Sequence, residues 1–142
     1  MTQEERQLLL KDLCARQPYG VKFKAENEDS PIELHYVRDE DVYGRIYSNL
    51  PYWIEIIKPY LRPMSSMTEE EKKQFFKMKQ MSVTVVVPNV NRLEIEYIVD
   101  LEDDGDGLNH LYDWLNAHHF DYRGLIEKGL AIEAPEDMYK TE

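Results

Sequence analysis

Cysteine is nearly absent from this sequence: Cys14 is the only one in 142 residues. A lone cysteine excludes an intramolecular disulfide, and nothing in the chain requires an oxidising compartment. We interpret Cys14 as a thiol of the hydrophobic core. Glycine and proline are also scarce, with six and seven residues, and there is no low-complexity tract. This composition is typical of a folded domain rather than a disordered chain.

Long apolar runs are missing as well. A membrane-spanning helix needs about 18 or more apolar residues, and no stretch of the chain approaches that length. The first residues, MTQEERQLLLKDL, lack the basic segment and long apolar run of a secretory signal. We therefore predict a cytoplasmic protein without membrane contact.

Basic residues are outnumbered: 17 Lys and Arg stand against 28 Asp and Glu, for a net charge of −11. Such a field repels phosphate backbones and anionic lipid surfaces, so we predict no direct binding of nucleic acid. The acidity serves solubility in the simplest interpretation. An alternative is an acidic mimic of nucleic acid that inhibits a DNA-binding protein.

The apolar spacing predicts an α+β fold, in a single domain of residues 1–142: an antiparallel sheet of about five strands, with an N-terminal helix and C-terminal helices packed on it. Thr2 and Glu5 form a capping box that begins a helix to about Arg16, which Pro18 and Gly20 end. Period-two alternation then predicts a three-stranded meander over 21–25, 32–36 and 42–47.

The next segment, 50–67, is predicted to be extended and packed on the sheet, because Pro59 and Pro63 exclude regular structure. Gly44, inside the third predicted strand, indicates a bulge or a close approach to the backbone. The later elements expected are a helix over 68–79 with a Thr68–Glu71 capping box, a hairpin over 83–99, a helix over 108–118 and a short helix over 121–129.

The acidic loop DLEDDGDG resembles the beginning of a calcium loop, with Asp100, Glu102 and Asp104 at positions one, three and five. The match fails at position twelve, where Leu111 replaces the bidentate glutamate. We therefore assign no metal or cofactor, and expect a strand-to-helix turn whose aspartates cap the following helix.

Three histidines fall within ten residues, at His110, His118 and His119. His110 and His118 are about 12 Å apart along a helix axis and about 80° apart around it, which excludes a shared metal. We predict that His118 and His119 cap the end of the helix. His110 and Asp113 could orient a general base, but no nucleophile has a recognisable setting, so we assign no catalytic residue.

One group of aromatic residues and arginines has the composition of an interaction hot spot. Packing in the core would explain the same residues. The group comprises Arg45, Tyr47, Tyr52, Trp53, Tyr60 and Arg62.

Three strings, KDLCARQPYGVK, IKPYLRPMSSMTEEE and HHFDYRGLIEKGLAIEAP, occur in this order. Together they resemble a family of small proteins encoded by gut anaerobic bacteria and by their phages and mobile elements. The resemblance covers roughly residues 1–22, 57–71 and 114–134. That family has no established activity, so the resemblance implies an accessory role and no catalytic residue.

The leading hypothesis is a non-enzymatic protein that binds another protein, with a homo-oligomer as a further option. Two alternatives stay open: the acidic mimic, and a metal-assisted enzyme built around Asp100, Glu102, Asp104 and His110.

Metal ions provide a test of the last alternative. We expect calcium, magnesium and zinc each to leave the melting temperature unchanged, because the acidic loop lacks its bidentate ligand. Thermal unfolding with each ion, and with a chelator as control, measures this. A rise in melting temperature that the chelator reverses would support the metal-assisted enzyme.

Overall fold

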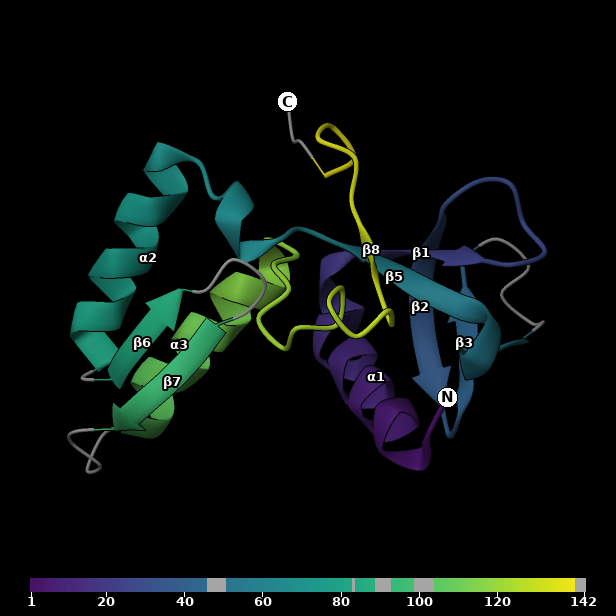
Figure 1. Cartoon of the computed structure of the whole chain (residues 1–142), viewed down its shortest axis with the longest axis horizontal. Helices are drawn as coiled ribbons and strands as arrows, with labels where there is room; N and C mark the ends of the chain where they lie inside the picture. The colour runs from purple at the N-terminus through teal and green to yellow at the C-terminus, as the bar shows by residue number, and fades with distance from the viewer. Residues whose placement is uncertain (46–50, 83, 89–92, 99–103, 140–142) are drawn as a thin grey trace. The chain divides into compact units, whose positions relative to one another are not determined.

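The structure, a computed structural model, describes residues 1–45, 51–82, 84–88, 93–98 and 104–139, with side chains for 1–45, 51–77 and 111–139. Figure 1 shows a mixture of helices and strands, which confirms the α+β class. The chain groups into two compact units, one formed by Met1–Leu61 with Leu125–Glu142 and one by Arg62–Gly124. The prediction of a single domain stays a prediction beside this division.

Helix α1 spans Gln3–Arg16 and begins as predicted. The Thr2 hydroxyl accepts a hydrogen bond from the Glu5 amide at 3.1 Å, and the Glu5 carboxylate accepts one from the Thr2 amide at 2.8 Å. A 3-10 turn over Gln17–Tyr19 follows, and Gly20 ends it with a φ of 71°. Glycine suits this left-handed position because it has no Cβ.

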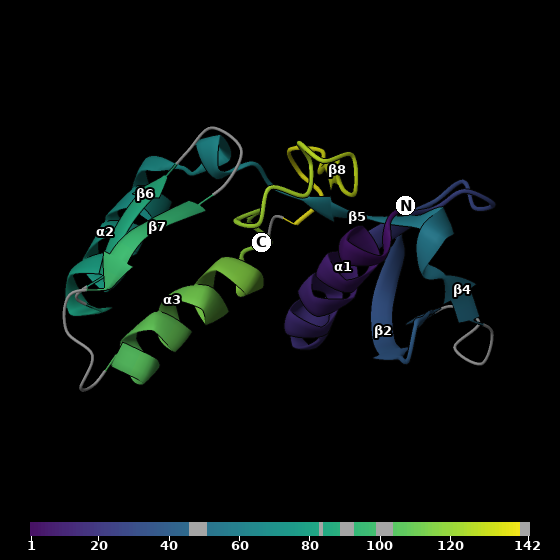
Figure 2. The same ribbon diagram turned by 60° about the horizontal axis from the view of Figure 1, so that its bottom comes forward.

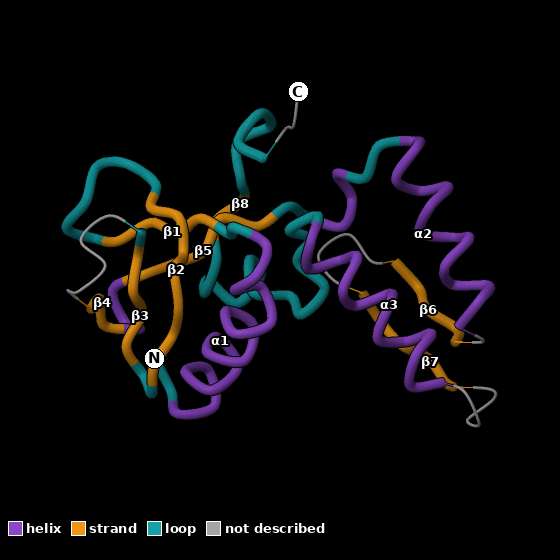
Figure 3. The backbone as a smooth tube through the Cα atoms, turned by 180° about the vertical axis from the view of Figure 1, so that it is seen from behind, coloured by secondary structure: helices purple, strands orange, loops and turns teal. Residues whose placement is uncertain are grey.

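The first unit contains one six-stranded sheet in the order β4-β3-β2-β1-β5-β8. Figure 3 shows these strands in orange. All neighbours are antiparallel except β5 and β8, and β1, β2 and β3 form the predicted meander. The strands are β1 (Lys22–Ala25), β2 (Ile32–Arg38), β3 (Asp41–Gly44), β4 (Pro51–Trp53), β5 (Ile57–Leu61) and β8 (Ile132–Glu133).

Strand β5 corrects the prediction that Pro59 excludes regular structure. Pro59 lies inside the strand, opposite Phe23 of β1. Strand β8 pairs with β5 only at Tyr60 and Leu61, so Pro59 has one neighbouring strand. Sheets tolerate proline at such edge positions because its missing N–H can face the unpaired side.

Strand β2 carries a bulge at His35. Leu34 lies opposite Gly44, whereas Tyr36 lies opposite Tyr43, so β2 has one residue more than β3 between these pairs. Successive residues of β3 point to opposite faces, and therefore Leu34 and Tyr36 point to opposite faces too. The simple alternation had placed Leu34 and Tyr36 on the same face, and this was wrong.

One face of the sheet packs against α1, which runs alongside β2 in Figure 2. Leu9 and Leu13 of the helix are fully buried in this core, together with Leu125 from the C-terminal segment. The prediction of a core thiol was wrong, because Cys14 is exposed. The sheet contributes Phe23, Ala25, Ile32, Leu34, Val42, Tyr52, Ile57 and Leu61 to the buried cluster.

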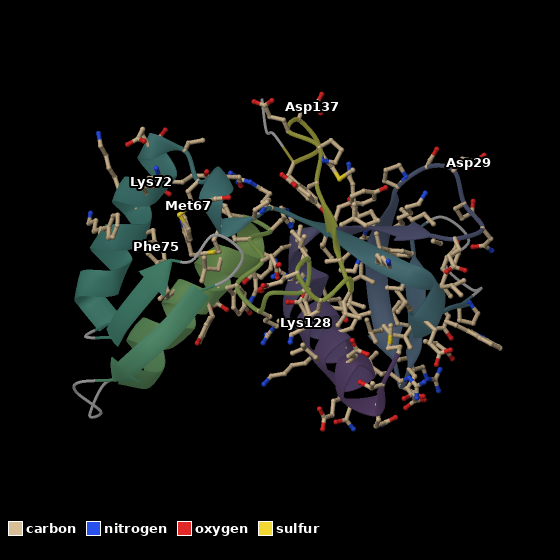
Figure 4. All side chains as sticks on the ribbon, in the orientation of Figure 1. Asp29, Met67, Lys72, Phe75, Lys128 and Asp137 are labelled. Carbon is tan, nitrogen blue, oxygen red and sulfur yellow. The ribbon has the colours of Figure 1, made fainter. Side chains whose placement is uncertain are left out.

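The second unit has its own core and its own two-stranded sheet, in which β6 and β7 form the predicted hairpin. The expected single sheet of about five strands with C-terminal helices packed on it was therefore wrong in detail. Phe75 of α2 and Met67, which precedes this helix, are labelled in Figure 4, and both belong to a cluster that includes Leu111 and Leu115 of α3. The elements are α2 (Glu69–Ser82), β6 (Thr84–Pro88), β7 (Leu93–Ile98) and α3 (Asp104–Ala117).

The predicted short helix over 121–129 is replaced by turns. The Gly129 amide donates to the Ile126 carbonyl at 3.0 Å, and the Leu130 amide donates to the Leu125 carbonyl at 2.9 Å. Gly129 has a φ of 76°, so it ends this single turn as expected of a glycine. The turn brings the buried Leu125 and Leu130 into the first core.

Gly44 allows a test of this packing. A Cβ at this position would overlap Cγ2 of Ile32 and lie 3.5 Å from Cζ of Phe23. Gly44→Ala should lower the free energy of unfolding by about 1–3 kcal/mol, because the β-branched Ile32 cannot rotate its methyl group away. Chemical denaturation measures this loss. In an Ile32→Ala background the loss should shrink; an equal loss in both backgrounds would refute the steric explanation.

Candidate functional site

The face of the six-stranded sheet that points away from α1 presents side chains to solvent. We call it the outer face. Its members follow from the strand register and the bulge: Lys22, Lys24, Glu33, Tyr36, Arg38, Asp41, Tyr43, Arg45, Pro51, Trp53, Lys58 and Tyr60.

An aromatic corner lies at one end of this face, over β2, β3 and β4. The rings of Tyr36 and Tyr43 stack with centroids 4.3 Å apart and planes 8° from parallel. Pro51 lies opposite Tyr43, and Trp53 follows it on the edge strand with 68% of its surface exposed. Of the large hydrophobic side chains that the structure describes, Trp53 is the most exposed.

Sequence reasoning missed Tyr36 and Tyr43 as members of this corner. The alternation of β2 placed Tyr36 on the buried face with Leu34, and only the extra residue of β2 turns Tyr36 outward to meet Tyr43. His35, the bulged residue, supports the corner because its ring meets Tyr36 edge to face at 5.0 Å. No local sequence signal identifies such a bulge.

The structure brings together only some of the predicted interaction residues. Trp53, Tyr60 and Arg45 share the outer face, whereas Tyr52 points to the opposite side and is 7% exposed. Tyr52 packs edge to face on Phe23 at 5.5 Å, and its hydroxyl donates to Glu28 Oε1 at 3.2 Å. Tyr52 therefore serves the core, and Tyr47 lies outside the described residues.

Tyr60 is half-buried where the C-terminal segment meets the sheet. The Tyr139 hydroxyl accepts a hydrogen bond from the Lys22 amide and donates one to the Tyr60 carbonyl, both at 2.8 Å. Burial raises the pKa of this hydroxyl, so it stays protonated and can serve both bonds. Tyr139 thus joins the adjacent strands β1 and β5 through its side chain.

Arg62 belongs to the second unit and is held by its neighbours there. Its guanidinium donates two hydrogen bonds of 2.7 Å to the Glu71 carboxylate and lies 4.2 Å above the Phe120 ring. Burial alone would raise the pKa of Glu71, but hydrogen bonds and charge from Arg62, with the Thr68 amide, lower it below its usual value. These contacts fix the start of α2 against Phe120.

The prediction that His118 and His119 cap the end of α3 is confirmed, with the ring of His118 and the backbone of His119 making the contacts. His118 Nδ1 lies 2.9 Å from the Trp114 carbonyl oxygen, and its ring packs on Trp114 at 4.3 Å. His119 takes the left-handed position, with a φ of 64°, and its amide donates to the Asn116 carbonyl at 3.1 Å. The Phe120 amide then donates to the Leu115 carbonyl at 3.0 Å, which completes a Schellman motif.

The acidic loop falls largely outside the described residues. Asp100 and Glu102 are not described, nor is the side chain of His110. Helix α3 begins at Asp104, so Gly105 lies in a helix and does not form the sharp turn that a calcium loop requires at position six. Among the described residues, no three His, Cys, Asp or Glu side chains group as metal ligands would.

Comparisons with protein-family models, with curated proteins and with solved structures gave no match. In the part of the chain that the structure describes, no helix has the length and apolar character to cross a membrane.

The Arg62–Glu71 pair allows a pH test. Glu71→Gln retains the capping acceptor but loses the charge, so stability at pH 7 should fall by about 1–3 kcal/mol. Because the pKa of Glu71 is lower in the folded protein than in the unfolded chain, its ionised carboxylate stabilises the fold at pH values above the unfolded-state pKa. This stabilisation disappears as the pH falls through the folded-state pKa. The variant should therefore lose less stability than the parent between pH 7 and pH 3, as denaturation at both values measures.

Glu69→Gln is the matched control. Glu69 is exposed, and its one ion pair among the described residues is with Lys72, at 3.4 Å, so its removal should change stability by less than about 0.5 kcal/mol at either pH. If Glu71→Gln retained the full acid sensitivity of the parent, the ion pair would not be its source.

Proposed function

We propose that this chain is a non-enzymatic protein-binding module and that the aromatic corner of the outer face contacts its partner. The observation that carries the proposal is the 68% exposure of Trp53 next to a stacked tyrosine pair. Tryptophan and tyrosine are enriched among the residues that contribute most to protein–protein affinity. Exposed large aromatic groups gain free energy when a partner removes them from water.

The corner is also rigid, which favours affinity. Strand pairing fixes the backbones of β3 and β4, with Val42 opposite Tyr52 and Tyr43 opposite Pro51. The stacked rings of Tyr36 and Tyr43 hold each other in place. A preorganised surface loses little conformational entropy on binding, so more of the contact energy appears as affinity.

The proposal extends to biological context. We infer an accessory protein of the phage or mobile-element type that acts in the cytoplasm on another protein. Its support is the resemblance of three segments, around Pro18, Pro59 and Leu125, to small proteins of gut anaerobes and their phages. The alternative of an acidic nucleic-acid mimic has the net charge of −11 as its only support.

Affinity capture with the full chain tests the proposal. The chain is used as bait in lysate of the cells that encode it, beside a Trp53→Ser variant. Partners of the parent should bind the variant at least about thirtyfold more weakly, as expected of a tryptophan hot spot worth about 2 kcal/mol. Because Trp53 is exposed, the melting temperature should stay the same.

Phe76→Ser is the matched control, because Phe76 is a large exposed hydrophobic residue of the second unit, at 47% exposure. It should retain the partners. The proposal would be contradicted if Trp53→Ser retained the partners, or if only Phe76→Ser lost them. A concentration-dependent dimer that Trp53→Ser dissociates would identify the partner as a second copy.

A further inference from the structure

The outer face contains two lysines placed directly opposite each other. Lys24 of β1 and Lys58 of β5 are Cα partners in the antiparallel ladder, and both are exposed. Side chains in such pairs begin about 5 Å apart, and like charges directly opposite each other destabilise a sheet. Neither lysine forms an ion pair with any residue that the structure describes. Within the described part of the chain, these two neighbouring ammonium groups therefore have no carboxylate at ion-pair distance.

The net charge of the outer face is opposite in sign to the net charge of the whole chain. Its charged members are five basic and two acidic residues, although the chain has 28 acidic and 17 basic ones. Glu33 already pairs with Arg45. Arg38 lies opposite Asp41 in the ladder of β2 and β3. The positive charge left over is that of Lys22, Lys24 and Lys58, which we call the lysine corner.

From this placement we infer that the partner of the outer face presents a short acidic segment, whose carboxylates bind the lysine corner while an apolar group binds Trp53. The inference rests on the proposed function and specifies the partner's chemistry. Carboxylates would neutralise a repulsion that the free protein tolerates. Charge complementarity of this kind fixes register and speeds association more than it adds affinity.

The two corners lie at opposite ends of the outer face. The rows of Trp53 and Lys24 are separated by a distance of about 20 Å along the strands. The four strand spacings from β4 to β5 add about 19 Å across the strands. An extended chain covers the resulting diagonal of about 28 Å with about eight residues. The inferred segment is therefore short and has an apolar end and an acidic end.

A single-stranded nucleic acid fits these observations less well than an acidic peptide. Nucleic-acid binders offer open aromatic faces to the bases, whereas Tyr36 and Tyr43 stack on each other at 4.3 Å. A long polyanion would also extend beyond the lysine corner into the field of a chain with a net charge of −11. Screening over about 8–10 Å lets a short acidic segment experience mainly the local lysines.

Chemical-shift mapping on the isotope-labelled full chain tests the inference with two short probes, hexaglutamate and hexathymidylate. Hexaglutamate should shift the amide signals of Lys22, Lys24 and Lys58 at low salt, and less at high salt. In Lys24→Gln/Lys58→Gln its binding should be about fivefold weaker, because two exposed ion pairs are lost. The same variant should melt at a higher temperature than the parent, since the like-charge pair is gone.

Lys11→Gln/Lys128→Gln is the control, because it removes two exposed lysines of the same unit and gives the same net charge. It should bind hexaglutamate as the parent does. The inference is overturned if hexaglutamate causes no shift at the lysine corner, if both double variants weaken it equally, or if hexathymidylate binds there more tightly. If the same amide signals shifted when only the protein concentration was raised, the lysine corner would be assigned to contact with a second copy of the chain. This result would also overturn the inference.

Failure of this inference is distinguishable from failure of the proposed function. If partners captured by the parent are lost with Trp53→Ser but kept by Lys24→Gln/Lys58→Gln, the binding module stands and the acidic segment is refuted. If Trp53→Ser keeps them, the proposed function itself fails.

Discussion

The fold of the first unit depends on how a single helix covers a sheet with two faces. Helix α1 covers one face with Leu9 and Leu13, which are fully buried. The period-two geometry of strands then sends every second side chain to the other face, where the residues need not be apolar. Because the bulge at His35 reverses this alternation within β2, it places Val37 inward and Tyr36 outward. The Tyr36–Tyr43 stack of the aromatic corner is thus a consequence of one extra residue.

The outer face is less stable than it could be, and that is informative. Exposure of Trp53 leaves a large apolar side chain in water, and the facing lysines Lys24 and Lys58 repel each other. Neither arrangement improves folding: Trp53 stays exposed, and a carboxylate at position 58 would suit the isolated sheet better than a lysine does. A partner that covers the aromatic group and neutralises the lysines gives both arrangements a physical role.

Local signals in the sequence predicted the elements whose causes are local. The Thr2–Glu5 and Thr68–Glu71 capping boxes, the left-handed Gly20 and the alternation of β1 were all visible in neighbouring residues.

The predictions that failed depended on contacts between distant residues. The pairing of Pro59 with Phe23 and the separate β6–β7 sheet are not encoded in any short window. Cys14 fits an apolar stripe by spacing, yet Asp12 and Arg16 take buried positions of the helix with an ion pair of 2.8 Å. In the candidate site, amino-acid composition was enough to select Trp53 as an interaction residue. The outward orientation of Tyr36 follows only from the register of β2 against β3.

Site-specific photocross-linking in the native cells tests the central claim most directly. A benzoylphenylalanine at position 43, beside Tyr36 on the outer face, should give a cross-linked adduct with another protein, because the aromatic corner lies against the partner. The same group at position 11, an exposed site on α1, should give none. An adduct from position 11 alone, or equal adducts from both positions, would contradict the assignment of the outer face as the binding surface.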